Sequence, residues 1–287
     1  MESRVGNRTR TAILLILLAA VFYPVYPELF SAWIHQADSS HGLLVPLVSL
    51  YFVWTCRERL RQAEASSSPS GLVLLSASLI VYLLALVGDI AVVARAMIVF
   101  SLAGLVLYLY GGKIFRILAF PLFFLLFMVP VPVSVIGLVA LPLQTLATMI
   151  SSSLIQLCSI PVLREGNMLY FVQTQLEVAE ACSGIRSIVA LIMLGSIFVY
   201  FSKLGLTRKI ILLCSAVPVA LAANILRISG TGVLAHFYGD QVARGFLHEF
   251  SGLAVFIFGL LVLGMENVLL GRGLRFWRPR FMDGGET

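Results

Sequence analysis

The chain has 287 residues, of which 60% are hydrophobic and only 12% carry charge, and its mean hydropathy is +0.99. This composition excludes a soluble globular enzyme and indicates an all-α, polytopic membrane protein, because a bilayer-spanning helix satisfies its own backbone hydrogen bonds. The net charge of +6 is explained by basic residues beside the apolar runs, so a nucleic-acid partner is not needed.

Apolar runs recur along the whole chain and predict a bundle of about eight transmembrane helices in a single integral membrane domain, residues 1–287. The predicted spans are 11–32, 42–55, 71–92, 96–111, 115–131, 184–202, 209–235 and 249–270. The first run begins at Thr11 and is not followed by a small-residue cleavage site, so we expect it to be retained as a span.

A further apolar stretch, residues 133–160, is long enough to cross but contains Pro142, Gln144 and three consecutive serines. Basic residues beside spans accumulate on the cytoplasmic side. If this stretch does not cross, both termini are cytoplasmic, and 15 of the 20 basic residues face the cytoplasm, including those of the tail at 271–287. If it crosses, the bias disappears. We therefore predict an interfacial or re-entrant segment on the outer face of the plasma (inner) membrane.

Residues 161–183 are then an outer loop. Between residues 168 and 181 apolar and polar side chains alternate around Gln173–Gln175. This pattern is typical of a short β-hairpin, which could hold an extended peptide. A solvated connector fits the same pattern, so both interpretations stay open.

The segment Glu180–Ser187, with the sequence Glu-Ala-Cys-Ser-Gly-Ile-Arg-Ser, ends this loop and opens an apolar helix. A lone cysteine in a membrane helix is most often a small buried hydrophobe. Cys182 differs because it lies at the start of its helix, where unpaired N–H groups and the helix dipole stabilise a thiolate. Arg186 follows one turn later and favours the thiolate as well. Cys182 is therefore a candidate nucleophile on the outer side.

Arg227 lies within another apolar helix, where a charged side chain normally lines a polar cavity or pairs with a partner. Asn224 and Thr231 share its helical face and form a polar stripe with it. The alternative is an arginine that reaches the outer headgroups or pairs with Asp240 or Glu249.

His248 opens the last predicted span, and Gly252, one turn on, is expected to let another helix approach closely. A lone histidine at a membrane boundary is often only an interfacial residue. Its importance comes from Cys182 and Arg227 on the same side of the membrane. His35 and His41 also face outward, where they shape either the site or its rim.

These motifs resemble the exosortase/archaeosortase family of membrane transpeptidases, and in particular a bacterial exosortase. The segments that carry the resemblance are Glu177–Ser187, Asn224–Ile228, Tyr238–Gly239 and His248–Gly252, supported by Asp38–Pro46, Phe120–Pro132 and Arg164–Asn167. Ser39 departs from the family, which more often has an aromatic residue there.

The resemblance implies a membrane-embedded thiol protease and transpeptidase. Such an enzyme cleaves PEP-CTERM-type sorting signals (Pro-Glu-Pro, an apolar helix and a basic tail) from secreted proteins and transfers the protein to a lipid or polysaccharide acceptor. Cys182 is then the nucleophile, Arg227 the cationic stabiliser and His248 the general acid/base. The supporting residues are Arg186, Asn224, Glu180 and His41.

Two other classes of protein fit parts of the sequence. A metal-dependent membrane protease could draw ligands from the four histidines and Asp38, but H-E-x-x-H and compact ligand spacing are absent from the sequence, so no metal or cofactor is predicted. A transporter or polysaccharide-export subunit without peptidase activity could use Arg186, Arg227 and Asp89 along a polar pathway. The sequence has neither the inverted repeat nor the matched broken helices typical of transporters.

Overall fold

The computed structural model describes residues 2–172, 174–178, 184–239 and 246–272. The chain divides into two compact units, Met1–Pro132 and Val133–Thr287. The described residues are mostly helical, and the single small sheet among them lies in the second unit.

Four described segments are long and apolar enough to cross a membrane, namely Pro69–Val87, Ala91–Met128, Leu206–Tyr238 and Gly252–Gly271. A bent pair, Thr9–Val21 with Tyr23–His35, adds a fifth if it is one span. The structure therefore confirms a mostly helical chain with several candidate spans. Helix length and composition do not confirm the predicted count of eight.

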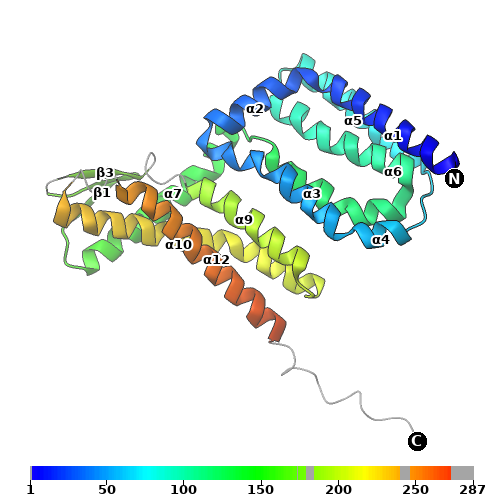
Figure 1. The fold of residues 1–287 in the computed structure, drawn as a ribbon. Coiled ribbons are helices and arrows are strands. Elements are labelled where there is room, and N and C mark those ends of the chain that lie inside the picture. The colour runs from blue at the N-terminus through cyan, green and yellow to red at the C-terminus, as the bar shows by residue number, and fades with distance from the viewer. Residues whose placement is uncertain (1, 173, 179–183, 240–245, 273–287) are drawn as a thin grey trace, which may run out of the picture. The chain divides into compact units, whose positions relative to one another are not determined.

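The predicted first span, residues 11–32, is bent in the structure. It comprises α1 (Glu2–Val21), the 3-10 turn η1 (Tyr23–Val25) and α2 (Tyr26–His35). The bend of 49° follows from Pro24, which lacks a backbone N–H and whose ring clashes with the preceding helical turn. The chain continues through η2 (Ala37–Leu43), α3 (Val45–Thr55) and α4 (Arg57–Gln62), all in the first unit (Figure 1).

Small residues bring α5 (Pro69–Val87) and α6 (Ala91–Phe124) into close contact. A Cβ at Gly104 would lie 2.6 Å from the backbone nitrogen of Leu75, so the two backbones almost touch there. Further along, Ser101 Oγ donates a hydrogen bond of 3.0 Å to Ser78 Oγ. The order of these contacts makes the two helices antiparallel.

Gly111 divides α6 into two stretches with different packing partners. Its φ of +78° is a conformation that favours glycine, and a Cβ there would lie 1.9 Å from the Ser66 carbonyl oxygen. Before Gly111 the helix runs along α5. After Gly111 it runs along α3, where Ser49 Oγ donates a 2.8 Å hydrogen bond to the Pro121 carbonyl, and it ends in η3 (Leu125–Met128). The predicted boundary between the fourth and fifth spans falls at this break.

The second unit opens with α7 (Val133–Leu157), which is one continuous helix rather than a re-entrant pair although it contains Pro142. An antiparallel sheet follows, in the order β1 (Leu163–Glu165), β2 (Met168–Tyr170) and β3 (Gln175–Glu177). The sequence predicts a hairpin within residues 168–181, whereas the described sheet has three strands and begins at Leu163.

The sheet packs on α7 and on the C-terminal part of α10 (Leu206–Tyr238). Leu169 and Leu176, which pair across β2 and β3, are buried in one apolar cluster with Ile155 of α7 and Ile228 of α10. Gly232 allows this contact, since a Cβ there would lie 2.7 Å from an Ile155 methyl group. The sheet is thus fixed to the end of α10 that carries Arg227.

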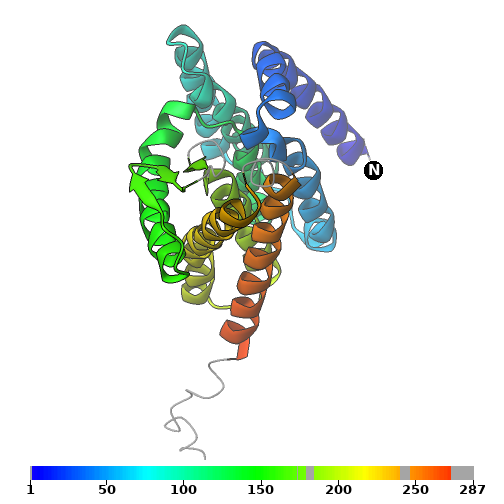
Figure 2. The same ribbon diagram turned by 90° about the vertical axis from the view of Figure 1, so that its left-hand side faces the viewer.

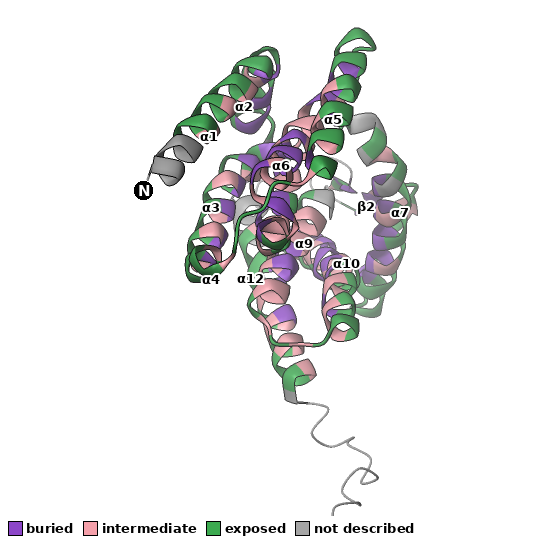
Figure 3. Cartoon of the chain, turned by 90° about the vertical axis from the view of Figure 1, so that its right-hand side faces the viewer, coloured by how far each residue is buried: buried purple, intermediate pink, exposed green. Residues whose placement is uncertain are grey.

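The helices α9 (Gly184–Phe201), α10 and α12 (Phe246–Arg272) pack together in the second unit (Figure 2). Their shared apolar cluster contains Leu191, Leu212, Ala216 and Leu263. Towards the outside the helices are apolar as well. Figure 3 shows the exposed faces of the helices in both units, and many of the exposed side chains there are large hydrophobic residues, as expected for surfaces that contact lipid.

Candidate functional site

Measured along the helix axes, the first turn of α9 lies beside the C-terminal third of α10, and such positions are called level below. The two helices are antiparallel, because only residues 202–205 join them. Ile188 of α9 lines a pocket together with Ala220 and Asn224 of α10. Ile188 lies four positions after Gly184, the first residue of α9, and Arg227 lies three positions after Asn224. Arg227 is therefore level with the first turn of α9, at a rise of 1.5 Å per residue.

Contacts between α9 and α12 show that these two helices are parallel. A Cβ at Gly259 of α12 would lie 2.6 Å from a Leu191 methyl group of α9. Nearer the C-terminal ends, Gly264 faces the ring of Phe198, with a corresponding distance of 4.0 Å. The N-terminal ends of α9 and α12 therefore lie at the same end of this helix group.

The same contact gives the level of His248. At 1.5 Å per residue, His248 lies about 16 Å before Gly259, and Gly184 lies about 10 Å before Leu191. The backbone of His248 is thus about one helical turn beyond the first residue of α9.

The predicted site residues differ in burial, and the structure describes only some of them. Arg227 is half-buried on α10, and Asn224 on the same helix is buried with 3% of its surface exposed. Arg186 is exposed in the first turn of α9. His248 is the third residue of α12, with a side chain outside the described part. Two further predicted residues, Cys182 and Glu180, lie outside the described residues.

The predicted close helix approach at Gly252 is wrong among the described residues. No described atom lies within 4 Å of a Cβ built there. The close approach is at Gly259, two turns later, because that glycine faces Leu191 of α9. The sequence contains both glycines and does not indicate which one faces a neighbour.

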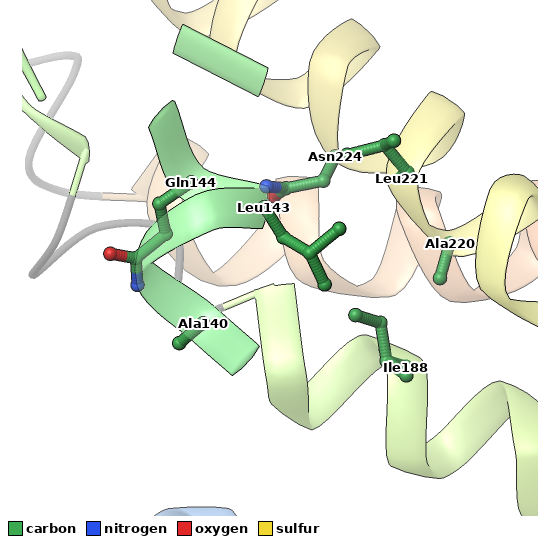
Figure 4. A pocket seen from close by; sticks show the side chains of 7 residues that line it. All are labelled: Ala140, Leu143, Gln144, Ile188, Ala220, Leu221 and Asn224. Atoms are coloured by element: carbon green, nitrogen blue, oxygen red, sulfur yellow. The ribbon is translucent and has the colours of Figure 1, made fainter. Parts of the chain in front are cut away.

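A pocket lies between α7, α9 and α10, next to the level of Arg227 (Figure 4). It is lined by Ala140, Leu143, Gln144, Ile188, Ala220, Leu221 and Asn224. It has room for about one water molecule.

Asn224 supplies the buried polar atom of this pocket. Its Oδ1 is fully buried and accepts no hydrogen bond from any described residue. Figure 4 shows the amide of Asn224 reaching from α10 towards Leu143 of α7. A buried amide oxygen without a donor is destabilising, so this position is suited to a donor supplied by a bound group.

His41 lies in η2 of the first unit, and its Nε2–H donates a hydrogen bond of 3.1 Å to the Phe127 carbonyl. Partial burial lowers the pKa of His41 below its usual value, while this hydrogen bond and the charge of Asp38 act in the opposite direction. His35 is exposed at the end of α2. Both histidines belong to the unit that does not contain Arg227.

Two polar residues of the second unit have contacts that the sequence does not predict. Gln144 counts in the sequence only as a polar interruption of an apolar stretch, yet it lines the pocket with Asn224. Glu266 lies inside the apolar helix α12, where it accepts a hydrogen bond from Ser215 Oγ of α10. An acidic residue within a membrane helix was the available signal for Glu266.

Among the described residues, no group of three or more histidine, cysteine, aspartate or glutamate side chains is arranged to hold a metal ion. Cys56 is buried, Cys158 and Cys214 are exposed, and none of these three forms a disulfide. The described residues therefore offer a polar helix face and a small pocket as the chemical features of the second unit.

The apolar helices and the exposed hydrophobic faces define an integral membrane protein. A family model described as transmembrane exosortase (Exosortase_EpsH) matches residues 33–265, and the chain therefore belongs to the transmembrane exosortase family. This confirms the family indicated by the sequence motifs. No curated protein and no solved structure matches the chain.

Proposed function

We propose that the protein is a membrane-embedded cysteine peptidase and transpeptidase. It cleaves PEP-CTERM-type signals from the C-termini of secreted proteins and passes the protein to an acceptor at the outer face of the plasma membrane. The proposal is supported by membership of the exosortase family, which does not favour the alternative of a transporter or export subunit.

The observation that carries the proposal is the alignment of three helix positions. Arg227 on α10 is level with the first turn of α9, and the backbone of His248 on α12 is about one turn beyond it. Cys182 precedes Gly184, the first residue of α9, by two residues. In the proposed site a thiol, a guanidinium and an imidazole meet at this end of the helix group, and these are the groups that thiol peptide transfer needs.

In the proposed reaction the Cys182 thiolate attacks the scissile carbonyl carbon, and Arg227 stabilises the oxyanion that forms. The carbon–nitrogen bond then breaks, and the leaving amine takes a proton from the His248 imidazolium. A thioester on Cys182 remains. The acceptor gives its proton to His248 as it attacks the thioester, and the thiolate is released. An apolar setting favours this transfer over hydrolysis by restricting water.

We also propose eight spans with both termini in the cytoplasm. The chain reverses direction at Gly111, since the ring centroids of Phe100 and Phe123, which lie on either side of it, are 6.1 Å apart. This reversal supports counting residues 91–110 and 112–128 as two spans, each packed on a different partner helix. With α1, α3 and α5 these make five spans in the first unit, and α9, α10 and α12 add three.

The 33 residues of α10 extend about 50 Å, longer than the hydrocarbon core of about 30 Å, so its C-terminal third reaches the outer surface.

The test uses a tagged secreted substrate that carries a Pro-Glu-Pro signal, an apolar helix and a basic tail, co-expressed with the protein. We expect Cys182→Ala to be inserted normally and to abolish the shift to the processed form, with Cys158→Ala as the matched control at a free, exposed thiol. Mass spectrometry of the processed form then identifies the acceptor. Normal processing by the Cys182→Ala variant would falsify the mechanism.

A further inference from the structure

We propose that the outer edge of β3 is a docking site for the substrate, which adds to the sheet as a further strand. The occupant is a peptide segment in extended conformation, held by hydrogen bonds between its backbone and the backbone of Gln175 and Glu177. The inference rests on the proposed function for the identity of the peptide, whereas the open edge is a property of the described residues.

The hydrogen bonds between β2 and β3 leave one set of β3 backbone groups unused. The Val178 N–H donates to the Asn167 carbonyl at 3.0 Å, which makes these two residues a hydrogen-bonded pair. Such pairs alternate with non-bonded pairs in an antiparallel ladder, so Leu176 also bonds to β2, while the N–H and C=O groups of Gln175 and Glu177 point away from it. Within the described part of the chain, no group hydrogen-bonds to these outward groups.

The other edge of the sheet, at β1, is covered by α7. Gln156 Nε2 of α7 donates a hydrogen bond of 3.1 Å to the carbonyl of Val162, the residue before β1. One face of the sheet is covered too, because Leu176 is buried in the apolar cluster with α7 and α10. The β3 residues on either side of Leu176 are exposed. In the described sheet, β3 is therefore the open edge (Figure 1).

An extended peptide is the occupant that matches this edge. Unpaired N–H and C=O groups along an edge strand are a template for another strand, and several peptide-binding domains recognise their ligands in this way. Gln175 and Glu177 each present one donor and one acceptor, spaced about 7 Å apart along the strand. A neighbouring strand has its own donors and acceptors at the same spacing.

The proposed sorting signal suits such an edge. One residue separates its two prolines, so both can take positions whose nitrogen faces away from β3, where the missing N–H groups cost no hydrogen bond. The glutamate between them then directs its N–H and C=O towards β3. Like charges directly opposite each other destabilise a sheet, so we expect this glutamate opposite Gln175 rather than opposite Glu177.

The chain connects this edge to the proposed nucleophile over a short distance. Cys182 lies five positions after Glu177, so their Cα atoms are at most about 18 Å apart. About five extended residues of a bound peptide cover that distance. The edge can therefore bind one segment of the same peptide that the thiol cleaves.

Cysteine cross-linking tests the added strand without relying on turnover. The background protein carries Cys182→Ala, Cys158→Ser and Cys214→Ser, and retains the buried Cys56. The probe is the tagged substrate that the unmodified protein processes, with single cysteines at successive positions in and around its Pro-Glu-Pro segment. Copper phenanthroline is the oxidant, and gel mobility under non-reducing conditions detects the disulfide.

The pattern of cross-links identifies a strand. Gln175→Cys and Glu177→Cys are expected to link to substrate positions two residues apart, because paired residues of adjacent strands have Cα atoms about 5.5 Å apart, within the range of a disulfide. The control is Glu165→Cys on β1, which lies in the same row of the sheet as Glu177 through Met168. Two strand spacings put it about 10 Å from Glu177, so we expect no cross-link from it.

The possible results separate the docking site from the mechanism. Equal cross-linking from Glu165→Cys, links without the two-residue offset, or no link from Gln175→Cys and Glu177→Cys in an inserted protein overturns the added strand. If Cys182→Ala abolishes processing and cross-links are absent, the proposed function stands without this docking site. If cross-links form and Cys182→Ala still processes the substrate, the docking site stands without the proposed mechanism.

A proline in β3 provides the second measurement. Gln175→Pro removes one outward N–H and keeps the bonds to β2, so the unfolding temperature should stay close to that of the unmodified protein. Loss of that hydrogen bond is expected to raise KM for the tagged substrate about three- to tenfold, with a smaller change in kcat. Gln175→Ala keeps the N–H and should raise KM less. An unchanged KM in folded Gln175→Pro, or an equal rise in both variants, overturns the role of the backbone edge.

Discussion

Gly259 of α12 faces Leu191 of α9 so closely that a Cβ at position 259 would lie 2.6 Å from a Leu191 methyl group. We predict that Gly259→Val forces these helices apart and destabilises the protein by about 1–3 kcal/mol, as overpacking does elsewhere. Because the contact also sets the level of His248, processing is expected to fall as well. Thermal unfolding in detergent measures the first effect, with Gly271→Val as control, since no described atom lies within 4 Å of that position. Equal unfolding temperatures for the two variants contradict the prediction.

The reversal of α6 gives a second matched pair of variants. Gly111 has a φ of +78°, and a Cβ there would lie 1.9 Å from the Ser66 carbonyl oxygen. We predict that Gly111→Ala lowers the unfolding temperature, because it introduces both backbone strain and a clash with backbone. The adjacent Gly112→Ala adds a Cβ with no described atom within 4 Å and is expected to be neutral or slightly stabilising. Comparable destabilisation by both variants would count against a tight turn at Gly111.

Topology mapping distinguishes one span from two in residues 91–128. A single span puts Asp89 and Val131 on opposite sides of the membrane, whereas two spans that reverse at Gly111 put both positions outside. We predict that alkaline phosphatase fusions after Asp89 and after Val131 are both active. A fusion after Lys113 should be inactive, and one after Ala179 should be active. Activity at only one of the Asp89 and Val131 fusions excludes the reversal, and inactivity after Ala179 excludes an outer location of the cysteine motif.

The order of helices follows from hydropathy, because runs of apolar residues leave no other stable structure in a membrane. The predicted spans at 71–92, 184–202 and 249–270 each correspond to a helix. Breaks within helices are harder to predict from a sequence. Pro24 bends the first span through a local steric effect, whereas the reversal at Gly111 depends on contact with Ser66, which comes from a distant part of the chain.

The candidate site, too, could be predicted from the sequence only in part. Arg227 and Asn224 can be assigned to one helical face from their spacing alone. The pocket cannot be predicted, because it depends on Gln144 of α7 lying beside Asn224 of α10, and helix spacing contains no information on which helices are neighbours. The level of His248 likewise required the contact between Gly259 and Leu191.

His41 in η2 is expected to make the stability of the protein depend on pH. Burial lowers the pKa of His41, so the folded protein holds its imidazole neutral at a pH where the unfolded chain already binds a proton. Its contribution to stability is complete above the ordinary histidine pKa of about 6.5 and is lost as the pH falls through the lower pKa of the folded protein. We expect the unfolding temperature to decrease between pH 7 and pH 5.

His41→Gln is the matched control for that measurement. Glutamine does not titrate, yet its side-chain amide can still donate a hydrogen bond to the Phe127 carbonyl, as His41 Nε2 does. The decrease in unfolding temperature over the same pH range should therefore be smaller in this variant. An identical pH dependence in both proteins shows that other groups are responsible.

The guanidinium of Arg227 is expected to be needed for its geometry as well as its charge. Arginine presents a planar fork of donors to an oxyanion or thiolate, whereas lysine is a single point charge on a flexible stem. If Arg227 stabilises the developing charge, Arg227→Ala should lower the processing rate by about 10²–10³-fold, as loss of an oxyanion donor does in other enzymes. Arg227→Lys should recover only part of this loss. The neighbouring Leu226→Ala, at a position with 54% exposure, is the control and should keep the full rate. Full activity in Arg227→Lys would show that a positive charge alone suffices, and full activity in Arg227→Ala would remove the residue from the mechanism.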